Sequence, residues 1–205
     1  MTSSTLPAPA SALDVIYRRR AIRAYTSDPL DEKTIRALLD AAVQAPTAMH
    51  EEPWVFVVVQ DRTVLTRLSD RAKAGIAAEP AFRHLHDADG KAHSGDGFKR
   101  LVADPGFNIF YDAGTLIVIG TRPVSPFAAA DCWLAAENLM LAACAMGLGT
   151  CCIGFAVAVL NTPEAKRELG IPADVTVVAP IIVGVPRGTP APVGRKPPEI
   201  ARWVR

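Results

Sequence analysis

Hydrophobic and polar positions alternate with a helical period most clearly after Asp31. Apolar residues recur there at i, i+3, i+4, i+7 and i+8, namely at Ile35, Leu38, Leu39, Ala42 and Val43. Asp31 suits the N-cap, and Glu32 suits the first turn of this helix. Pro46 ends the helix because the residue before a proline disfavours helical backbone. Shorter helices are predicted over 14–20, 63–73 and 163–169.

Three apolar runs rich in β-branched residues predict strands over 53–60, 115–121 and 175–184. In the first run the residues that would point to either face of a strand are apolar, which predicts a central strand buried on both sides. The segment 128–146 is apolar nearly all round, so a core helix is expected there. The glycines at 147, 149 and 154 predict a turn after that helix, followed by further core.

Helices between the predicted strands indicate a sheet covered on both faces, without a regular alternation of strand and helix. The pattern therefore favours α+β over a doubly wound fold. Residues 1–13 are predicted to form a flexible leader, and residues 14–205 a single domain. Within it, the glycine-rich segment 79–106 is predicted to be a flexible excursion or lid. The proline-rich tail 185–205 is expected to run extended against another surface.

The charge balance excludes a whole-domain attraction to nucleic acid or to anionic membranes. The chain carries 22 Lys and Arg against 21 Asp and Glu, for a formal net charge of +1. The uncharged stretch 139–160 is long enough to span a membrane, but Asp131 and Glu137 precede it in the same helical pattern and glycines interrupt it. No secretory signal pattern precedes Leu13, and the four cysteines lie in apolar stretches. These features predict a cytoplasmic protein with reduced thiols.

The candidate chemistry is sparse when each segment is taken alone. The arginines at 18–20 and Arg23 suit a phosphate site, but a solvated helix end has the same composition. The histidines and aspartates at 84–93 lack a metal-ligand spacing, so no metal is expected. Adjacent Cys151 and Cys152 lack the spacer of a redox pair, and no nucleophile–base arrangement is visible.

Four segments of the sequence resemble the motifs of one protein family, and they occur in the same order as in that family. Arg19–Tyr25 (RRAIRAY) resembles an RRSxRxF segment, and Ala45–Trp54 resembles an APSxxNxQPW segment. Asp131–Gly154 resembles a central helix followed by a glycine turn, and Gly184–Pro186 with Gly194–Pro197 resembles closing GxP and RKP segments. In this order they resemble the FMN-dependent nitroreductase family, over about Asp14 to Trp203.

The resemblance implies a three-layer α-β-α sandwich with a central mixed sheet, in an intertwined homodimer with two FMN sites at the interface. It also implies an oxidoreductase that passes hydride from NAD(P)H through flavin N5 to a nitro, quinone or other small acceptor. No side-chain pair is built for acid–base work, so a ping-pong mechanism controlled by positioning is expected. Two alternatives are a flavin-binding or redox-sensing module without turnover, and a degenerate member that no longer binds FMN.

The resemblance further implies which residues hold the cofactor. The two arginine segments would bind the phosphate, the loop after Ala45 would pack near the ring, often from the second subunit, and the Gly154 N–H would face flavin N5. The implied cofactor-binding residues are Arg19, Arg20, Ala21, Arg23, Pro46, Thr47, Ala48, His50, Ile153, Gly154, Arg195 and Lys196. Ala21 replaces the usual serine, while His50, Glu52 and Val193 replace the usual asparagine, glutamine and basic residue.

Overall fold

The computed structural model of the chain describes residues 11–78, 100, 102–188 and 190–205. Residues 1–10 of the leader predicted over 1–13 and most of the excursion predicted over 79–106 lie outside these residues, as do the histidines at 84, 86 and 93. The first described helix, α1 (Ala12–Arg18), begins earlier than the helix predicted over 14–20. Ser11 and Asp14 start it there by capping each other's backbone N–H groups.

Four antiparallel strands form one sheet in the order β1-β2-β4-β3. They are β1 (Trp54–Val59), β2 (Thr115–Thr121), β3 (Gly149–Cys152) and β4 (Thr176–Gly184). The predicted mixed sheet is therefore antiparallel in its four strands, and the parallel component is an isolated bridge between Ala21 and Thr150.

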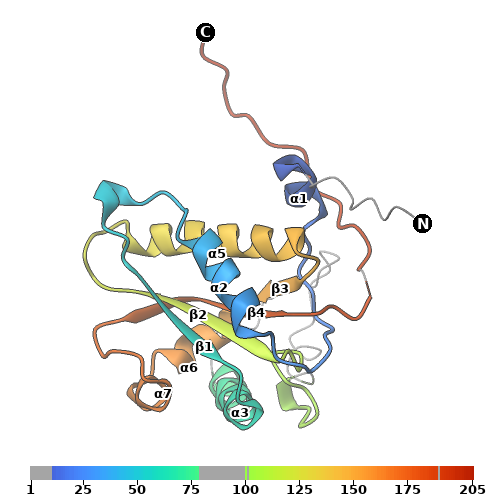
Figure 1. Cartoon of the computed structure of the whole chain (residues 1–205), viewed down its shortest axis with the longest axis vertical. Helices are drawn as coiled ribbons and strands as arrows, with labels where there is room; N and C mark the ends of the chain where they lie inside the picture. The colour runs from blue at the N-terminus through green and yellow to red at the C-terminus, as the bar shows by residue number, and fades with distance from the viewer. Residues whose placement is uncertain (1–10, 79–99, 101, 189) are drawn as a thin grey trace, which may run out of the picture.

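Helices cover both faces of this sheet and complete the predicted three layers (Figure 1). The helices α2 (Glu32–Ala42) and α5 (Ala128–Ala145) lie on one face. The other face is covered by α3 (Arg62–Ala78), α6 (Val157–Leu160) and α7 (Pro163–Leu169). Successive side chains of β2 point to opposite faces, so Leu116 packs toward α3 while Ile117 packs toward α5. The chain is thus α+β, as its pattern predicted.

The strand predicted to be central lies at an edge, so that prediction is wrong. β1 pairs with β2 alone among the described strands, and Val58 is 37% exposed. Its apolar pattern is explained by the helices that cover both of its faces. Such a pattern reports burial of the faces and carries no information about hydrogen-bonding neighbours.

The long helix α5 is also less buried than its composition predicted. Leu139 and Ala143 are fully buried against the sheet, but Trp133 and Leu134 on the outer side are 45% and 46% exposed. The helix therefore has a core face and an apolar face that no described part of the chain covers.

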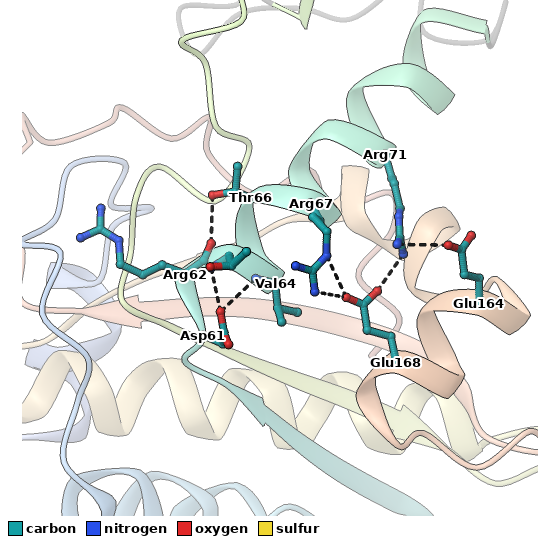
Figure 2. A network of polar contacts seen from close by, with 9 residues as sticks. Asp61, Arg62, Val64, Thr66, Arg67, Arg71, Glu164 and Glu168 are labelled. Carbon is teal, nitrogen blue, oxygen red and sulfur yellow. Dashed lines mark hydrogen bonds and ion pairs between the residues drawn. The ribbon is translucent and has the colours of Figure 1, made fainter.

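An ion-pair network joins α3 to α7 on the opposite side of the sheet (Figure 2). Arg67 donates from Nε and Nη2 to Glu168 Oε1 at 3.1 and 2.5 Å. Arg71 donates to Glu168 Oε2 at 2.8 Å and lies 3.1 Å from Glu164 Oε1. Both arginines lower the pKa of the Glu168 carboxyl, chiefly through the Arg67 hydrogen bonds.

Within the described residues, no helix is both long enough and apolar enough to cross a membrane.

Candidate functional site

The segment from Arg19 to Tyr25 runs extended beside the end of the sheet. The Ile22 N–H donates to the Thr150 carbonyl at 2.9 Å, and Tyr25 forms an isolated bridge with Pro186. The Tyr25 hydroxyl donates to the Ile22 carbonyl at 2.7 Å. Because an extended chain advances about 3.3 Å per residue, Arg20 and Arg23 are held about 10 Å apart along it.

A pocket of about 240 Å³, here named the α1 pocket, lies at the start of this segment. Arg18, Arg19 and Arg20 line it together with residues 186, 188 and 190. Arg20 Nη1 donates to the carbonyls of Tyr17 and Arg19 at 2.6 and 2.8 Å, which fixes its guanidinium at the end of α1. Arg19 Nε lies 3.7 Å from Glu137 Oε1 on α5. The predicted arginine cluster is thus gathered at one cavity, but without Arg23.

A second pocket of about 320 Å³, the Gly154 pocket, lies at the other end of the segment. Its wall consists of Arg23, Phe107, Ile109, Tyr111 and residues 151–155. The Ile153 N–H donates to the Pro180 carbonyl at 2.8 Å and anchors the turn to β4. Gly154 is exposed, its N–H has no acceptor in the described part of the chain, and a Cβ built there has nothing within 4 Å. This turn presents an open backbone donor beside a guanidinium.

The thiols and hydroxyl around the Gly154 pocket are held in their neutral forms. Burial raises the pKa of Cys151 and of Tyr111, and the Arg23 guanidinium opposes both shifts without reversing them. Burial raises the pKa of Cys152 to about 11. Raised pKa values keep the thiolate fraction of Cys151 and Cys152 small at neutral pH.

The loop that contains Pro46, Thr47, Ala48 and His50 lies elsewhere. The Ala48 N–H donates to Asp131 Oδ2 at 3.2 Å, which places the loop at the first turn of α5. Arg19 reaches α5 at Glu137, and the Cys144 thiol near the far end of that helix lies 3.9 Å from the carbonyl of Val15 in α1. The loop and α1 therefore lie toward opposite ends of α5 (Figure 1), and the pocket that the end of α1 lines is remote from the loop.

Arg195 and Lys196 are exposed on an extended tail. The tail passes α1 and runs away from the three layers (Figure 1). Neither side chain forms an ion pair with a described residue. One chain therefore brings together Arg19 with Arg20, and Arg23 with Ile153 and Gly154, but neither the 46–50 loop nor Arg195 and Lys196 line these pockets.

Three contributors to the site were missed from the sequence. Phe107 and Tyr111 pack edge to face at 5.7 Å in the wall of the Gly154 pocket, yet they follow the segment with the weakest hydrophobic pattern. Asp131 is 4% exposed and fixes the loop at Ala48, whereas the sequence pattern shows it only as a charge within a helix. The signal available in the sequence was an acidic residue in the first turn of an otherwise apolar helix.

Comparison with known proteins agrees with this arrangement. The profile of the nitroreductase family matches residues 16–185, which include every described strand and the whole lining of the Gly154 pocket. The chain belongs to the nitroreductase family. An NADH dehydrogenase of Thermus thermophilus is 29% identical over 214 residues, with 98% of each chain covered.

Two further relatives extend this comparison. An Archaeoglobus fulgidus protein, provisionally named NADH dehydrogenase/NAD(P)H nitroreductase, is 29% identical over 176 residues, with 85% of each chain covered. A Bacteroides fragilis nitroreductase solved with bound FMN has a TM-score of 0.75 at 25% identity, and covers 95% of this chain and 98% of its own. The expected family and fold are confirmed.

Proposed function

We propose that this nitroreductase-family chain is an FMN-dependent oxidoreductase that takes hydride from NAD(P)H and passes it to a nitro, quinone or other small acceptor. The observation that supports this most directly is the open Gly154 N–H in a pocket that Arg23 also lines. The FMN bound by the Bacteroides fragilis relative supports the choice of cofactor. The names of the Thermus and Archaeoglobus relatives support a nicotinamide donor.

The described residues fit a flavin mononucleotide chemically. Guanidinium groups bind phosphate oxygens in bidentate geometry, and the α1 pocket is lined by three of them at Arg18, Arg19 and Arg20. The extended segment then leads to Arg23 in the Gly154 pocket, about 10 Å along the chain from Arg20. Phe107 and Ile109 provide apolar walls for a flat ring. Arg23 therefore belongs in our proposal to the ring end of the cofactor and not to its phosphate.

Once bound, FMN would supply hydride acceptance and donation, and the protein would supply position and charge. The Gly154 N–H would donate a hydrogen bond to the ring, and the Arg23 guanidinium would stabilise negative charge on it. Phe107 and Ile109 would exclude water from the reacting face. Because donor and acceptor would use the same pocket in turn, the proposal includes ping-pong kinetics.

The proposal also includes a homodimer in which the loop 46–48 of each chain completes the site of its partner. The loop carries Met49, which is 87% exposed, and α1 exposes Leu13 and Tyr17 at 63% and 73%. Together with Trp133 and Leu134 on the outer face of α5, these side chains place exposed apolar surface on this helix and toward both of its ends. A partner chain would cover this surface and bring the loop to the Gly154 pocket.

The test is titration of flavin-free protein with FMN and with FAD, followed by NADH and NADPH oxidation with a nitroaromatic and a quinone. We expect FMN uptake, a yellow complex and acceptor-dependent oxidation. Protein that takes up no FMN contradicts the cofactor assignment. Protein that binds FMN but oxidises neither nicotinamide is a flavin-binding module, and contradicts the enzyme assignment.

A further inference from the structure

A third pocket adjoins the Gly154 pocket and has no role in the function proposed above. Its volume is about 420 Å³, and we name it the Arg62 pocket. It shares Arg23, Phe107 and Tyr111 with the Gly154 pocket, so the two cavities have part of their walls in common. A molecule of moderate size could therefore extend from one cavity into the other.

The lining of the Arg62 pocket is strongly basic. Arg23, Arg62 and Arg187 contribute three guanidinium groups, against a single carboxylate from Asp112. In the described part of the chain none of these three arginines forms an ion pair. On the same helix as Arg62, Arg67 and Arg71 both have carboxylate partners, and Figure 2 shows the Arg62 side chain extending away from that network.

Uncompensated like charges around one cavity raise its electrostatic free energy, and a bound anion lowers it. Arginine is also the side chain best matched to a planar carboxylate or to phosphate oxygens. The charge distribution of this pocket therefore indicates an anionic ligand.

The backbone around the pocket is held in an unusual conformation. Tyr111 and Asp112 have positive φ angles of 52° and 55°, a region that non-glycine residues seldom adopt. The Tyr111 N–H donates to the Asn108 carbonyl at 2.9 Å, and the Asn108 side chain accepts from the Phe110 N–H at 2.8 Å. Such conformations persist where the surrounding structure enforces them, and they concentrate at binding sites. Here they direct Tyr111 between the two cavities.

The part of the pocket wall that contains Arg187 is hydrogen-bonded to the extended segment 19–25. The Arg187 N–H donates to the Ala24 carbonyl at 2.9 Å, which ties the start of the tail to the residue after Arg23. Two of the three guanidiniums therefore come from extended segments that this hydrogen bond joins, and the third comes from the first turn of α3.

We propose that the Arg62 pocket binds the phosphate or carboxylate of the small molecule that exchanges electrons in the Gly154 pocket. This inference rests on the proposed function and specifies its substrate class as a molecule with an anionic group beside its reactive ring. The same chemistry has two sources, namely the 2′-phosphate of NADPH and a carboxylate on the acceptor.

Calorimetry on the flavin-free protein separates these sources and does not depend on turnover. The probes are adenosine 2′-monophosphate against adenosine, and benzoate against benzamide. We expect one anionic probe to bind at least about tenfold more tightly than its neutral partner. Preference for the nucleotide assigns the site to NADPH, and preference for benzoate assigns it to the acceptor.

Variants locate the binding. Arg62→Gln and Arg187→Gln should each weaken the preferred anion by about ten- to a hundredfold, since each loses a charge-assisted hydrogen bond. Arg122→Gln is the matched control, because Arg122 is exposed and follows the far end of β2 from the pocket. Asp112→Asn should strengthen anion binding, and asparagine tolerates the positive φ at this position.

The FMN-loaded enzyme provides the second readout. In Arg62→Gln, the ratio of kcat/KM for the anionic over the neutral substrate should fall by the same factor as the probe affinity. Equal binding of charged and neutral probes, or unchanged anion affinity in both arginine variants, would overturn the proposal. If FMN is not taken up while the anionic probe still binds with this arginine dependence, the failure lies in the proposed function.

Discussion

Left-handed backbone at non-glycine residues occurs in two short stretches of the described chain. One stretch contains Met49, His50 and Glu52, and the other contains Tyr111 and Asp112. Each such residue costs of the order of 1–3 kcal/mol unless its surroundings compensate. Asp131 anchors the first stretch at Ala48, and Asn108 anchors the second. Both stretches belong to the site proposed above, which gives this strain a functional reason.

The Gly154 amide can be removed and retained in a matched pair of variants. Gly154→Ala keeps the N–H, and its methyl group would meet nothing within 4 Å. Gly154→Pro removes the N–H at the first residue of a 3-10 turn, where proline is tolerated. We expect the alanine variant to match the parent in FMN affinity and rate, and the proline variant to lower both. Loss of about 1–3 kcal/mol of hydrogen bonding corresponds to about five- to a hundredfold.

Equilibrium titration and stopped-flow reduction by NADH measure these two quantities. Far-ultraviolet circular dichroism shows whether the proline variant is folded. A folded proline variant that binds and reduces FMN like the alanine variant would remove the amide from the mechanism.

Thiol reactivity should follow the raised pKa values of Cys132 and Cys152, each about 11. Because both shifts come mainly from burial, these thiols stay protonated at neutral pH. Alkylation by iodoacetamide, followed by mass spectrometry at each position, should be slow at pH 7 and still rising at pH 10. The same peptides in urea are the control and should level off near the ordinary cysteine pKa of about 8.5. A plateau near that value in the folded protein would contradict this prediction.

At the scale of elements, sequence pattern predicted what depends on local periodicity. The helix after Asp31 and the fully buried β2 were recognised because their side-chain spacing alone defines them. β3 was missed because it is four residues long and lies among glycines, so that only its pairing with β4 makes it a strand. The edge position of β1 was likewise invisible, since pairing partners leave no trace in periodicity.

The site divides in the same way. Gly154 was identified through the order of family-like segments, and Arg19 and Arg20 through their charge. Arg23 lies in a different pocket from Arg19 and Arg20 because the backbone is extended from Arg19 onward. A helix predicted over 14–20 did not indicate this separation. Tyr111 reaches the site through a positive φ that no propensity predicts.

The α3–α7 network should stabilise the fold in a pH-dependent manner. Because the folded-state pKa of Glu168 lies below its ordinary value of 4.5, its ionised carboxylate favours folding above that pH. This contribution should be lost as pH falls through the folded-state pKa. At pH 7, Glu168→Gln should lower stability by about 1 kcal/mol and the melting temperature by about 2–4 °C.

Thermal melts of parent and variant at pH 7 and pH 3 measure this difference, which should shrink at the lower pH. Glu32→Gln is the control, because Glu32 pairs with Arg36 on the exposed surface of α2 and should contribute less. Equal losses for the two variants at pH 7 would show that the network adds nothing beyond an ordinary surface pair.

At the scale of the whole molecule, the proposed dimer can be tested at the exposed apolar face of α5. Trp133→Glu places a charge on the apolar outer face of this helix, where Trp133 is 45% exposed. We expect the variant to be monomeric at micromolar concentration and to lose FMN, while Trp133→Phe remains dimeric. Light scattering coupled to size exclusion determines both masses. A monomeric parent protein would contradict the dimer outright.

The proposed role of the tail in FMN binding can be tested by removing the charge of Arg195. Arg195→Ala should weaken FMN binding by about ten- to a hundredfold if Arg195 reaches a partner's phosphate site. Arg202→Ala removes the same charge from the same exposed tail and serves as the control. FMN titration of the flavin-free variants compares them, and equal affinities would exclude Arg195 from the phosphate site.

The unpaired edge of β1 in the described sheet should make the newly synthesised chain prone to aggregation. Its six residues, Trp54–Val59, contain no charge and no proline, which are the usual protections of an unpaired strand edge. Each chain thus has a β-prone hydrophobic segment along an edge that no described strand pairs, and this edge can template pairing with another copy. Fast overproduction should therefore drive this protein into inclusion bodies, and slower synthesis at low temperature should raise the soluble yield. A lysine at Val58, the exposed position of the strand, should act as a gatekeeper and have the same effect.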